Sequence, residues 1–190
     1  MHDVPYFRPP ELSGILADSA GIGFAMSCED RTGSILATLA ASKPGGRFVE
    51  LGGGTGAGAA WLAMGMDADA RLTTVEVDPA VQDIARRHLG TDPRIEFVTA
   101  DAGDWLTEAT GTYDFAYVDC RPGKYLRLPD LLTLLAPGAL YVVDDMNPQP
   151  TWPDDHQPRV DGFLRDLPDV PNLRATPMHW ASGLVIAART

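Results

Sequence analysis

Apolar positions along this 190-residue chain follow two periods, which alternate from one segment to the next. Short continuous apolar runs bounded by Gly, Pro or acidic residues predict buried β-strands, and apolar residues three or four positions apart predict helices. The pattern predicts strands at 48–51, 71–77, 95–99, 113–118, 140–143, 173–180 and 184–188. It predicts helices at 10–18, 35–43, 59–66, 79–88, 125–135 and 159–167, with a further one around Trp105 and Leu106.

Strands and helices that alternate in this way indicate the α/β class with a mostly parallel sheet. The last two predicted strands are different, because only the turn Ala181-Ser182-Gly183 separates them, and so short a connection predicts an antiparallel hairpin. We expect the final strand, Leu184 to Ala188, to lie between two neighbours, because its apolar run is nearly continuous. The length suits one domain, residues 1–190, with an N-terminal arm at 1–25.

A glycine-rich turn follows the first predicted strand. The strand leads into Gly52-Gly53-Gly54-Thr55-Gly56-Ala57-Gly58, and a helical segment comes directly after it. Glycine permits positive φ and lets a ligand approach the main chain without meeting a Cβ, while free N–H groups at a helix start offer donors. The turn is therefore a candidate cofactor site. The dinucleotide fingerprint G-x-G-x-x-G fits it only with Ala57 as the final small residue.

Glu50 distinguishes between two cofactor classes at this turn. A carboxylate there would repel a diphosphate, whereas a sulfonium cofactor that carries an ammonium group tolerates it. Together Glu50, Gly52, Gly54 and Gly56 give E-x-G-x-G-x-G, which resembles motif I of class I S-adenosylmethionine-dependent methyltransferases. The resemblance implies S-adenosyl-L-methionine as the cofactor. It also implies a Rossmann-like, doubly wound sheet of seven strands, mostly parallel, with a C-terminal antiparallel hairpin.

Other positions resemble cofactor contacts of the same superfamily. Glu76 ends the second strand, where an acid can accept bonds from both ribose hydroxyls, although it does so in the dinucleotide fold as well. Asp101 and Ala102 follow the third strand, and the resemblance places Asp101 at the adenine amino group. Asp101 is equally a candidate N-cap. Cys28 lies in a segment that resembles the loop closing over the cofactor in catechol-type O-methyltransferases, and a plain packing helix is the alternative.

Acidic residues end the fourth and fifth predicted strands. We expect Asp119, Asp144 and Asp145 to converge, because ligands bind outside the carboxyl ends of strands in open α/β sheets. Mutual repulsion of such carboxylates requires compensation, which a hard cation such as Mg²⁺ supplies. The pattern V-D followed by P-G-x-x-x-x-x-D-D resembles catechol and caffeoyl-CoA type O-methyltransferases over about residues 26–146, and implies these acids as Mg²⁺ ligands. Alternatively, Asp119 and Asp144 cap helices or order the Pro-Gly turn.

The candidate catalytic residues are Asp119, Lys124 and His156. The resemblance implies Lys124 as the group that takes the acceptor's proton, but Cys120-Arg121-Pro122-Gly123 adds two residues before it, which can lift it off the metal. Asp145 stands where the family has Asn. The predicted lid loop, 147–158, brings Trp152 as an apolar wall and His156 as a second candidate base. A solvent-exposed loop whose Trp packs on the body is the alternative.

Charge and composition narrow the choice of partners. With 15 basic and 26 acidic residues the net charge is -11, which disfavours nucleic acids and anionic lipids and favours a small-molecule substrate. No apolar run approaches the ~20 residues of a bilayer span, and the start does not resemble a signal peptide, so we expect a cytoplasmic protein. Two cysteines are too few for a disulfide framework or a zinc site. A homodimer is compatible with this sequence.

These features predict an enzyme that methylates a small molecule, most simply on a hydroxyl oxygen. Three alternatives remain open at this point: a metal-independent N- or O-methyltransferase on the same fold, a dinucleotide-dependent oxidoreductase, and a non-catalytic module that binds S-adenosylmethionine. The sequence does not identify the methyl acceptor.

Overall fold

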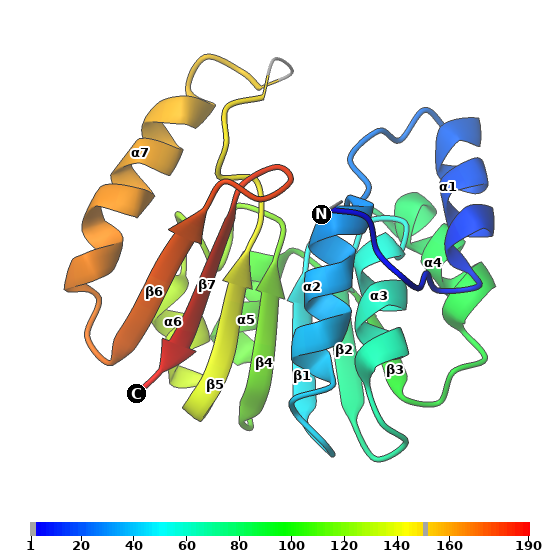
Figure 1. Cartoon of the computed structure of the whole chain (residues 1–190), viewed down its shortest axis with the longest axis horizontal. Coiled ribbons are helices and arrows are strands. Elements are labelled where there is room, and N and C mark those ends of the chain that lie inside the picture. The colour runs from blue at the N-terminus through cyan, green and yellow to red at the C-terminus, as the bar shows by residue number, and fades with distance from the viewer. Residues whose placement is uncertain (1–2, 150–151) are drawn as a thin grey trace.

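The computed structural model describes residues 3–149 and 152–190, which form a seven-stranded sheet with helices on both faces (Figure 1). The strand order is β3-β2-β1-β4-β5-β7-β6. Strands β1 to β5 pair in parallel, and β7 runs antiparallel to both β5 and β6. The predicted α/β class, the doubly wound sheet and the terminal hairpin are confirmed. The strands are β1 Arg47–Leu51, β2 Arg71–Glu76, β3 Ile95–Thr99, β4 Tyr113–Val118, β5 Leu135–Val143, β6 Leu173–Met178 and β7 Leu184–Arg189.

The helices enclose two hydrophobic cores, one on each face of the sheet. Because successive side chains of a strand point to opposite faces, Phe48 of β1 joins the core beneath the first three helices, whereas Val49 and Leu51 join the core beneath the last three. Figure 1 shows α7 at one end of the sheet and α1 with α4 at the other. The helices are α1 Leu12–Gly21, α2 Asp30–Ala40, α3 Ala57–Gly65, α4 Pro79–Leu89, α5 Ala102–Glu108, α6 Leu128–Thr133 and α7 His156–Asp166, followed by the 3₁₀ turn Leu167–Asp169.

The segment between β4 and β5 departs from its predicted structure. A helix was expected over 125–135, but α6 has only six residues and β5 already begins at Leu135. The backbone explains the late start of the helix, because Arg127 directly before it has a φ of 60°. Pro137 and Gly138 lie within β5 as part of an irregular pairing with β4, so they interrupt a strand rather than end a helix.

The final strand has the predicted position. β7 lies between β5 and β6, and Leu184, Val185 and Ala187 are fully buried, while Ile186 and Ala188 are half-buried. The parallel strands all end along one edge of the sheet, the upper one in Figure 1. The connections diverge between β1 and β4 at this edge, which makes it the position where open α/β sheets bind ligands. Among the helices of the described residues, none is long and apolar enough to cross a membrane.

Candidate functional site

The glycine turn has a conformation that other residues would strain. Gly52, Gly54 and Gly56 have φ values of 86°, 53° and 95°, and the turn is tied to β2 by bonds from the N–H groups of Gly52 and Gly53 to the carbonyl of Val75. A Cβ on Gly52 would come within 2.9 Å of the carbonyl oxygen of Asp119. Glycine is therefore required both for backbone conformation and for close approach between the ends of β1 and β4.

The expected ribose ligand, Glu76, lies against this turn. Its carboxylate accepts one bond from the N–H of Gly54, at 2.9 Å, and one from the N–H of Asp78, at 3.0 Å. The last part of α1 approaches the turn as well, because Ser19 of this helix bonds the hydroxyl of Thr55 at 2.8 Å. The structure thus brings the glycine turn, the end of β2 and the N-terminal arm to one place, as expected for a nucleoside-containing cofactor.

Glu50 supports the turn from beneath. Its side chain is 1% exposed, and Thr74 on β2 donates a hydrogen bond of 2.6 Å to it. A Cβ on Gly58 would lie 2.2 Å from the carboxylate, so only glycine fits above it. Burial, with a smaller contribution from Glu76, raises the pKa of Glu50 to about 8, while the bond from Thr74 lowers it. The sequence suggested that Glu50 contacts the cofactor, but the structure places its carboxylate under the turn.

Asp101, Ala102 and Cys28 take three different positions. Asp101 is the N-cap of α5 and accepts bonds from the N–H groups of Gly103 and Asp104, which confirms its capping role. Ala102 is buried behind it at the end of β3. The adenine contact of Asp101 stays a prediction. Cys28 precedes α2 and is half-buried. Burial and the nearby carboxylates Asp144 and Asp119 raise the pKa of the Cys28 thiol, so this residue borders the acidic cluster as well as the cofactor turn.

Two of the three predicted acids meet at a tyrosine that the sequence analysis did not identify. The hydroxyl of Tyr117 donates to Asp144 at 2.9 Å and lies 3.4 Å from an oxygen of Asp119. The other oxygen of Asp144 accepts bonds from the hydroxyl of Ser182 and the N–H of Asp145. Asp144 is only 3% exposed, so these bonds replace the water that a carboxylate would otherwise bind.

The acids of this cluster are strongly perturbed. Burial, then the neighbouring Asp144, raise the pKa of Asp119 well above its ordinary range, and the positive charge of Lys124 opposes the shift. Burial and Asp144 also raise the pKa of Asp145, again against the effect of Lys124. The pKa of Tyr117 is raised well above its ordinary range by burial and the two carboxylates, so its hydroxyl stays protonated. Perturbed groups of this kind gather at functional sites.

Lys124 lies inside the cluster. Its side chain is 5% exposed, and its ammonium donates a bond of 2.7 Å to the backbone carbonyl oxygen of Asp144. The Pro-Gly turn before it is held in place, because Gly123 has a φ of 86° and its carbonyl accepts a bond of 2.6 Å from the hydroxyl of Tyr141. The longer turn was expected to lift Lys124 off the metal, and that expectation stays a prediction. The ammonium bonds the backbone of Asp144 and forms no direct ion pair with the described acids, but its charge lowers the pKa values of Asp119 and Asp145.

The geometry does not match the expected Mg²⁺ site. Within residues 3–149 and 152–190, no three His, Cys, Asp or Glu side chains are arranged to hold a metal ion. Both oxygens of Asp144 already have donors, and the buried ammonium of Lys124 places a positive charge near this carboxylate. Asp145 has a φ of 62°, and its backbone N–H rather than its side chain bonds the carboxylate of Asp144. The convergence of acids is confirmed for Asp119 and Asp144, but their donor set does not fit a divalent metal.

The lid region contributes an aromatic cluster beside the acids. The rings of Trp152 and His156 lie 4.2 Å apart, and Tyr125 meets His156 edge-on at 5.7 Å and Phe163 at 6.0 Å. Burial, with the charges of Lys124 and Arg121, lowers the pKa of His156, so its imidazole is neutral at pH 7. Part of the predicted lid, residues 150–151, lies outside the described residues. The rest packs Trp152 against the core.

Two atoms of this aromatic cluster are buried without a hydrogen bond. The hydroxyl of Tyr125 and Nε2 of His156 have no partner among the described residues. Burial, with a contribution from Asp145, raises the pKa of Tyr125 to about 12, so its hydroxyl is neutral. Because a buried polar atom without a partner costs about 1 to 3 kcal/mol, both atoms are candidates for contact with a ligand.

The residues missed from the sequence are Tyr117, Ser182 and Tyr125. Tyr117 could have been found, because it precedes Asp119 by two positions in a strand and therefore lies on the same face. Tyr125 directly follows a predicted site lysine and could have been included with it. Nothing local marks Ser182, which reaches Asp144 from the hairpin turn.

Comparison with known proteins identifies related sequences. A family model described as "Methyltransferase domain" matches residues 49–146, more than half of the chain. A Mycolicibacterium smegmatis protein provisionally named an O-methyltransferase is 34% identical over 111 residues, which cover 56% of this chain and 51% of that protein. The catechol O-methyltransferase of Mycobacterium tuberculosis is 27% identical over 160 residues, 73% of each chain. The chain thus spans about half the length of the curated relatives it first matches.

Solved structures share the complete fold. The cofactor-bound protein Rv0187 from MTB has a TM-score of 0.84 and 25% identity, with 95% of this chain and 89% of that chain covered. An O-methyltransferase from Bacillus cereus in complex with SAH has a TM-score of 0.85, with 99% and 94% covered; at 22% identity it supports the fold alone. On the match to its family model, this chain belongs to the methyltransferase domain family.

Proposed function

We propose that this protein transfers the methyl group of S-adenosylmethionine to a hydroxyl oxygen of a small molecule. One observation carries the proposal: a buried cluster of two carboxylates, a tyrosine and a lysine lies directly beside a glycine turn of the cofactor-binding type. The carbonyl of Asp119 would contact a Cβ placed on Gly52, so the two sites are adjacent. Membership of the methyltransferase domain family supports this cofactor, and Rv0187, at 25% identity, is itself described as cofactor-bound.

In this proposal the cofactor side is built by the ends of β1, β2 and β3. The N–H groups of the glycine turn and the carboxylate of Glu76 would hold the amino-acid and ribose parts, and Asp101 the adenine. Bound there, S-adenosylmethionine supplies an electrophilic methyl group on a positively charged sulfur. The protein's own contribution is to hold the acceptor oxygen in line with that methyl group, exclude water and remove one proton.

Asp119 is the group we assign to proton removal. A general base works best when its pKa approaches the working pH, and burial beside Asp144 moves the pKa of Asp119 in that direction. The carboxylate of Asp119 would accept the proton of the acceptor hydroxyl, whose oxygen would take the methyl group from the cofactor held at the glycine turn. Lys124, whose charge lies within the cluster, stabilises the negative charge that develops on the oxygen.

The acceptor would lie on the side of Tyr125, His156 and Trp152. Trp152 provides an apolar wall, and the unpartnered hydroxyl of Tyr125 and Nε2 of His156 offer neutral hydrogen-bonding groups to a polar substituent. A hydroxyl acceptor suits this site better than a charged amine, because Lys124 already compensates the acids that an ammonium would otherwise pair with.

Binding and transfer assays test the proposal. We expect S-adenosylhomocysteine to bind in isothermal titration calorimetry and NAD not to bind. With a labelled methyl donor, phenols and other hydroxyl compounds should accept label and matched amines should not. Binding of NAD alone would favour an oxidoreductase, and S-adenosylhomocysteine binding without transfer to any acceptor class would favour a binding module. A cytoplasmic location, a single domain and a homodimer stay predictions from the sequence.

A further inference from the structure

The acidic cluster contains its own cation. The ammonium of Lys124 is buried and bonded to the carbonyl of Asp144, and its charge opposes the upward pKa shifts of both Asp119 and Asp145. An unpaired ammonium is costly to bury, and the nearby charges of Asp119 and Asp145 offset part of that cost without a direct ion pair. The carboxylates likewise stay buried together only because a positive charge is present.

Hydrogen bonds occupy most of the acceptor positions of the Asp144 carboxylate. One oxygen accepts from Tyr117 and the other from Ser182 and the N–H of Asp145. These donors come from β4, from the β6–β7 turn and from the chain directly after β5, so three separate segments fix one carboxylate. A metal that displaced these donors from Asp144 would leave each of them buried without a partner.

A divalent ion would also meet like charge. Two cations a few ångströms apart repel strongly where water is excluded, and the lysine cannot swing away without breaking its bond to the backbone. The preceding Pro-Gly turn adds to this restraint, because Tyr141 holds the carbonyl of Gly123. The same turn contains the two residues by which the chain departs from the catechol-type pattern.

We propose that the ammonium of Lys124 takes the place of the divalent cation that the sequence pattern implies, and that this protein binds no divalent metal at Asp119, Asp144 and Asp145. The catalytic part of the inference rests on the proposed function, since Lys124 would then supply the positive charge for the acceptor oxygen. The binding part does not depend on it.

Titration with Mn²⁺, a paramagnetic stand-in for Mg²⁺, tests the binding part without any turnover. By electron paramagnetic resonance, the wild type should show no stoichiometric binding below about 1 mM Mn²⁺. Lys124→Met removes the charge and keeps a side chain of similar length, so the uncompensated acids should now bind Mn²⁺ at least tenfold more tightly than the wild type. The matched control is Lys43→Met, because Lys43 also donates one 2.7 Å bond to a backbone carbonyl but is exposed. It should bind no more Mn²⁺ than the wild type.

A second variant covers the case in which Lys124→Met does not fold. Lys124→Arg keeps the charge and should resemble the wild type in Mn²⁺ binding, with circular dichroism as the check on folding. Stoichiometric Mn²⁺ binding by the wild type at micromolar concentration, lost in Asp144→Asn, would overturn the inference. So would a Lys124→Met variant that folds and gains no Mn²⁺ affinity.

Turnover then separates this inference from the proposed function. If the wild type methylates an acceptor, its rate should change less than twofold in excess EDTA, and a loss of activity that Mg²⁺ restores would contradict the catalytic part. If the wild type binds S-adenosylhomocysteine but methylates nothing, the proposed function fails while the Mn²⁺ titrations still decide the binding part. The two failures are therefore distinguishable.

Discussion

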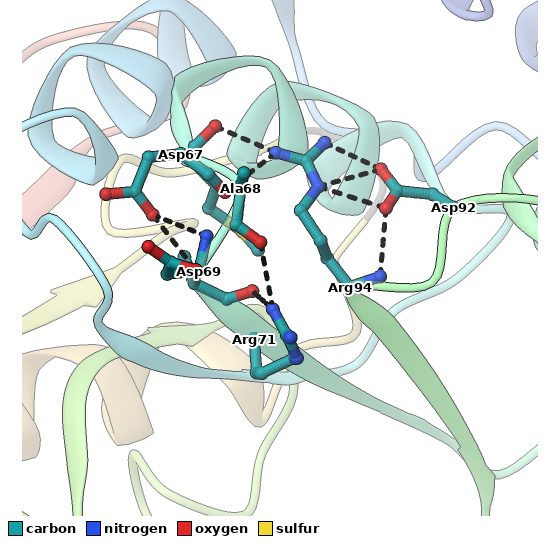
Figure 2. A network of polar contacts seen from close by, with 8 residues as sticks. Asp67, Ala68, Asp69, Arg71, Asp92 and Arg94 are labelled. Atoms are coloured by element: carbon teal, nitrogen blue, oxygen red, sulfur yellow. Dashed lines mark hydrogen bonds and ion pairs between the residues drawn. The ribbon is translucent and has the colours of Figure 1, made fainter.

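Charged side chains gather at both edges of the sheet, and the two groups are organised in opposite ways. At the amino edge, Figure 2 shows Arg94 between the carboxylate of Asp92 and the chain at Asp67, and Arg94 bonds the carbonyls of Met66 and Asp67. Two of its nitrogens bond Asp92, at 2.6 to 3.2 Å, and the third bonds the two carbonyls. Arg71 likewise bonds two carbonyls in the same network. At this edge the arginines have several partners each.

At the carboxyl edge the balance is reversed. The charge of Lys124 opposes the upward pKa shifts of Asp119 and Asp145, and Asp144 takes its hydrogen bonds from neutral groups and the backbone. The pKa values record the difference: bonds from Arg94 lower the pKa of Asp92, whereas burial and like charge raise that of Asp119. The same residue types thus stabilise the fold at one edge, whereas at the other edge carboxylates of like charge lie close together and their pKa values are raised. Only the second arrangement offers chemistry to a substrate.

The largest contrast between the edges should come from removing one cation from each. Lys124→Met should lower kcat about 1000-fold, because it removes the charge that stabilises the acceptor oxygen. Arg94→Met should leave kcat within twofold at a temperature where it is folded, because Arg94 lies at the far edge. Methyl transfer at saturating cofactor measures both. Equal losses in the two variants would show that Lys124 acts only on stability.

A second contrast concerns glycine at the two edges. Gly54→Val places a branched side chain at a φ of 53°, with Phe24 only 3.2 Å from the new Cβ, in the turn assigned to the cofactor. Affinity for S-adenosylhomocysteine should fall at least 100-fold by calorimetry. Gly138→Val is the matched control, since Gly138 also has a positive φ, 80°, but nothing lies within 4 Å of its Cβ position. It shares the backbone strain and should bind normally. A normal affinity in Gly54→Val would show that the cofactor does not bind at this turn.

The edges should also differ in the sign of their pH dependence. The pKa of Glu50 is raised from 4.5 to about 8, so its contribution to stability is complete below pH 4.5 and is lost as the pH rises through about 8. The neutral variant Glu50→Gln should therefore be more stable than the wild type at pH 9, by at least about 2 kcal/mol in the free energy of unfolding. Urea denaturation between pH 5 and 9 measures the crossover.

Asp92 supplies the opposite case. Its pKa is lowered by Arg94, so its contribution is present above the ordinary value of 3.8 and is lost as the pH falls through the lower, folded-state value. Asp92→Asn should thus be less stable than the wild type at pH 7 and approach it in strong acid. If the stability of Glu50→Gln and that of Asp92→Asn, each relative to the wild type, changed in the same direction with rising pH, the distinction between the edges would not hold.

The sequence allowed the cofactor side to be predicted better than the acceptor side, for a physical reason. The glycine turn, the end of β2 at Glu76 and the cap at Asp101 depend on local rules of turns, strand ends and helix starts. The bonds of Asp144 join residues up to 38 positions apart, and no local pattern contains them. The fold of the Pro-Gly turn before Lys124 depends on Tyr141, a long-range partner. The motif identified Glu50, but it did not show that the carboxylate of Glu50 would be buried under the turn.

The smallest expected effect tests whether the amino edge is purely structural. Arg94→Lys keeps the charge but cannot form the two-nitrogen contact with Asp92 while also bonding two carbonyls, so it should lower the free energy of unfolding by about 1 kcal/mol. Arg165→Lys, in an exposed pair with Asp166, should change it by less than about 0.5 kcal/mol. Urea denaturation gives both values, and calorimetry should show unchanged affinity for S-adenosylhomocysteine. A weakened affinity in Arg94→Lys would mean that the amino edge is coupled to the cofactor turn through β2, which joins Arg71 to the strand end at Glu76.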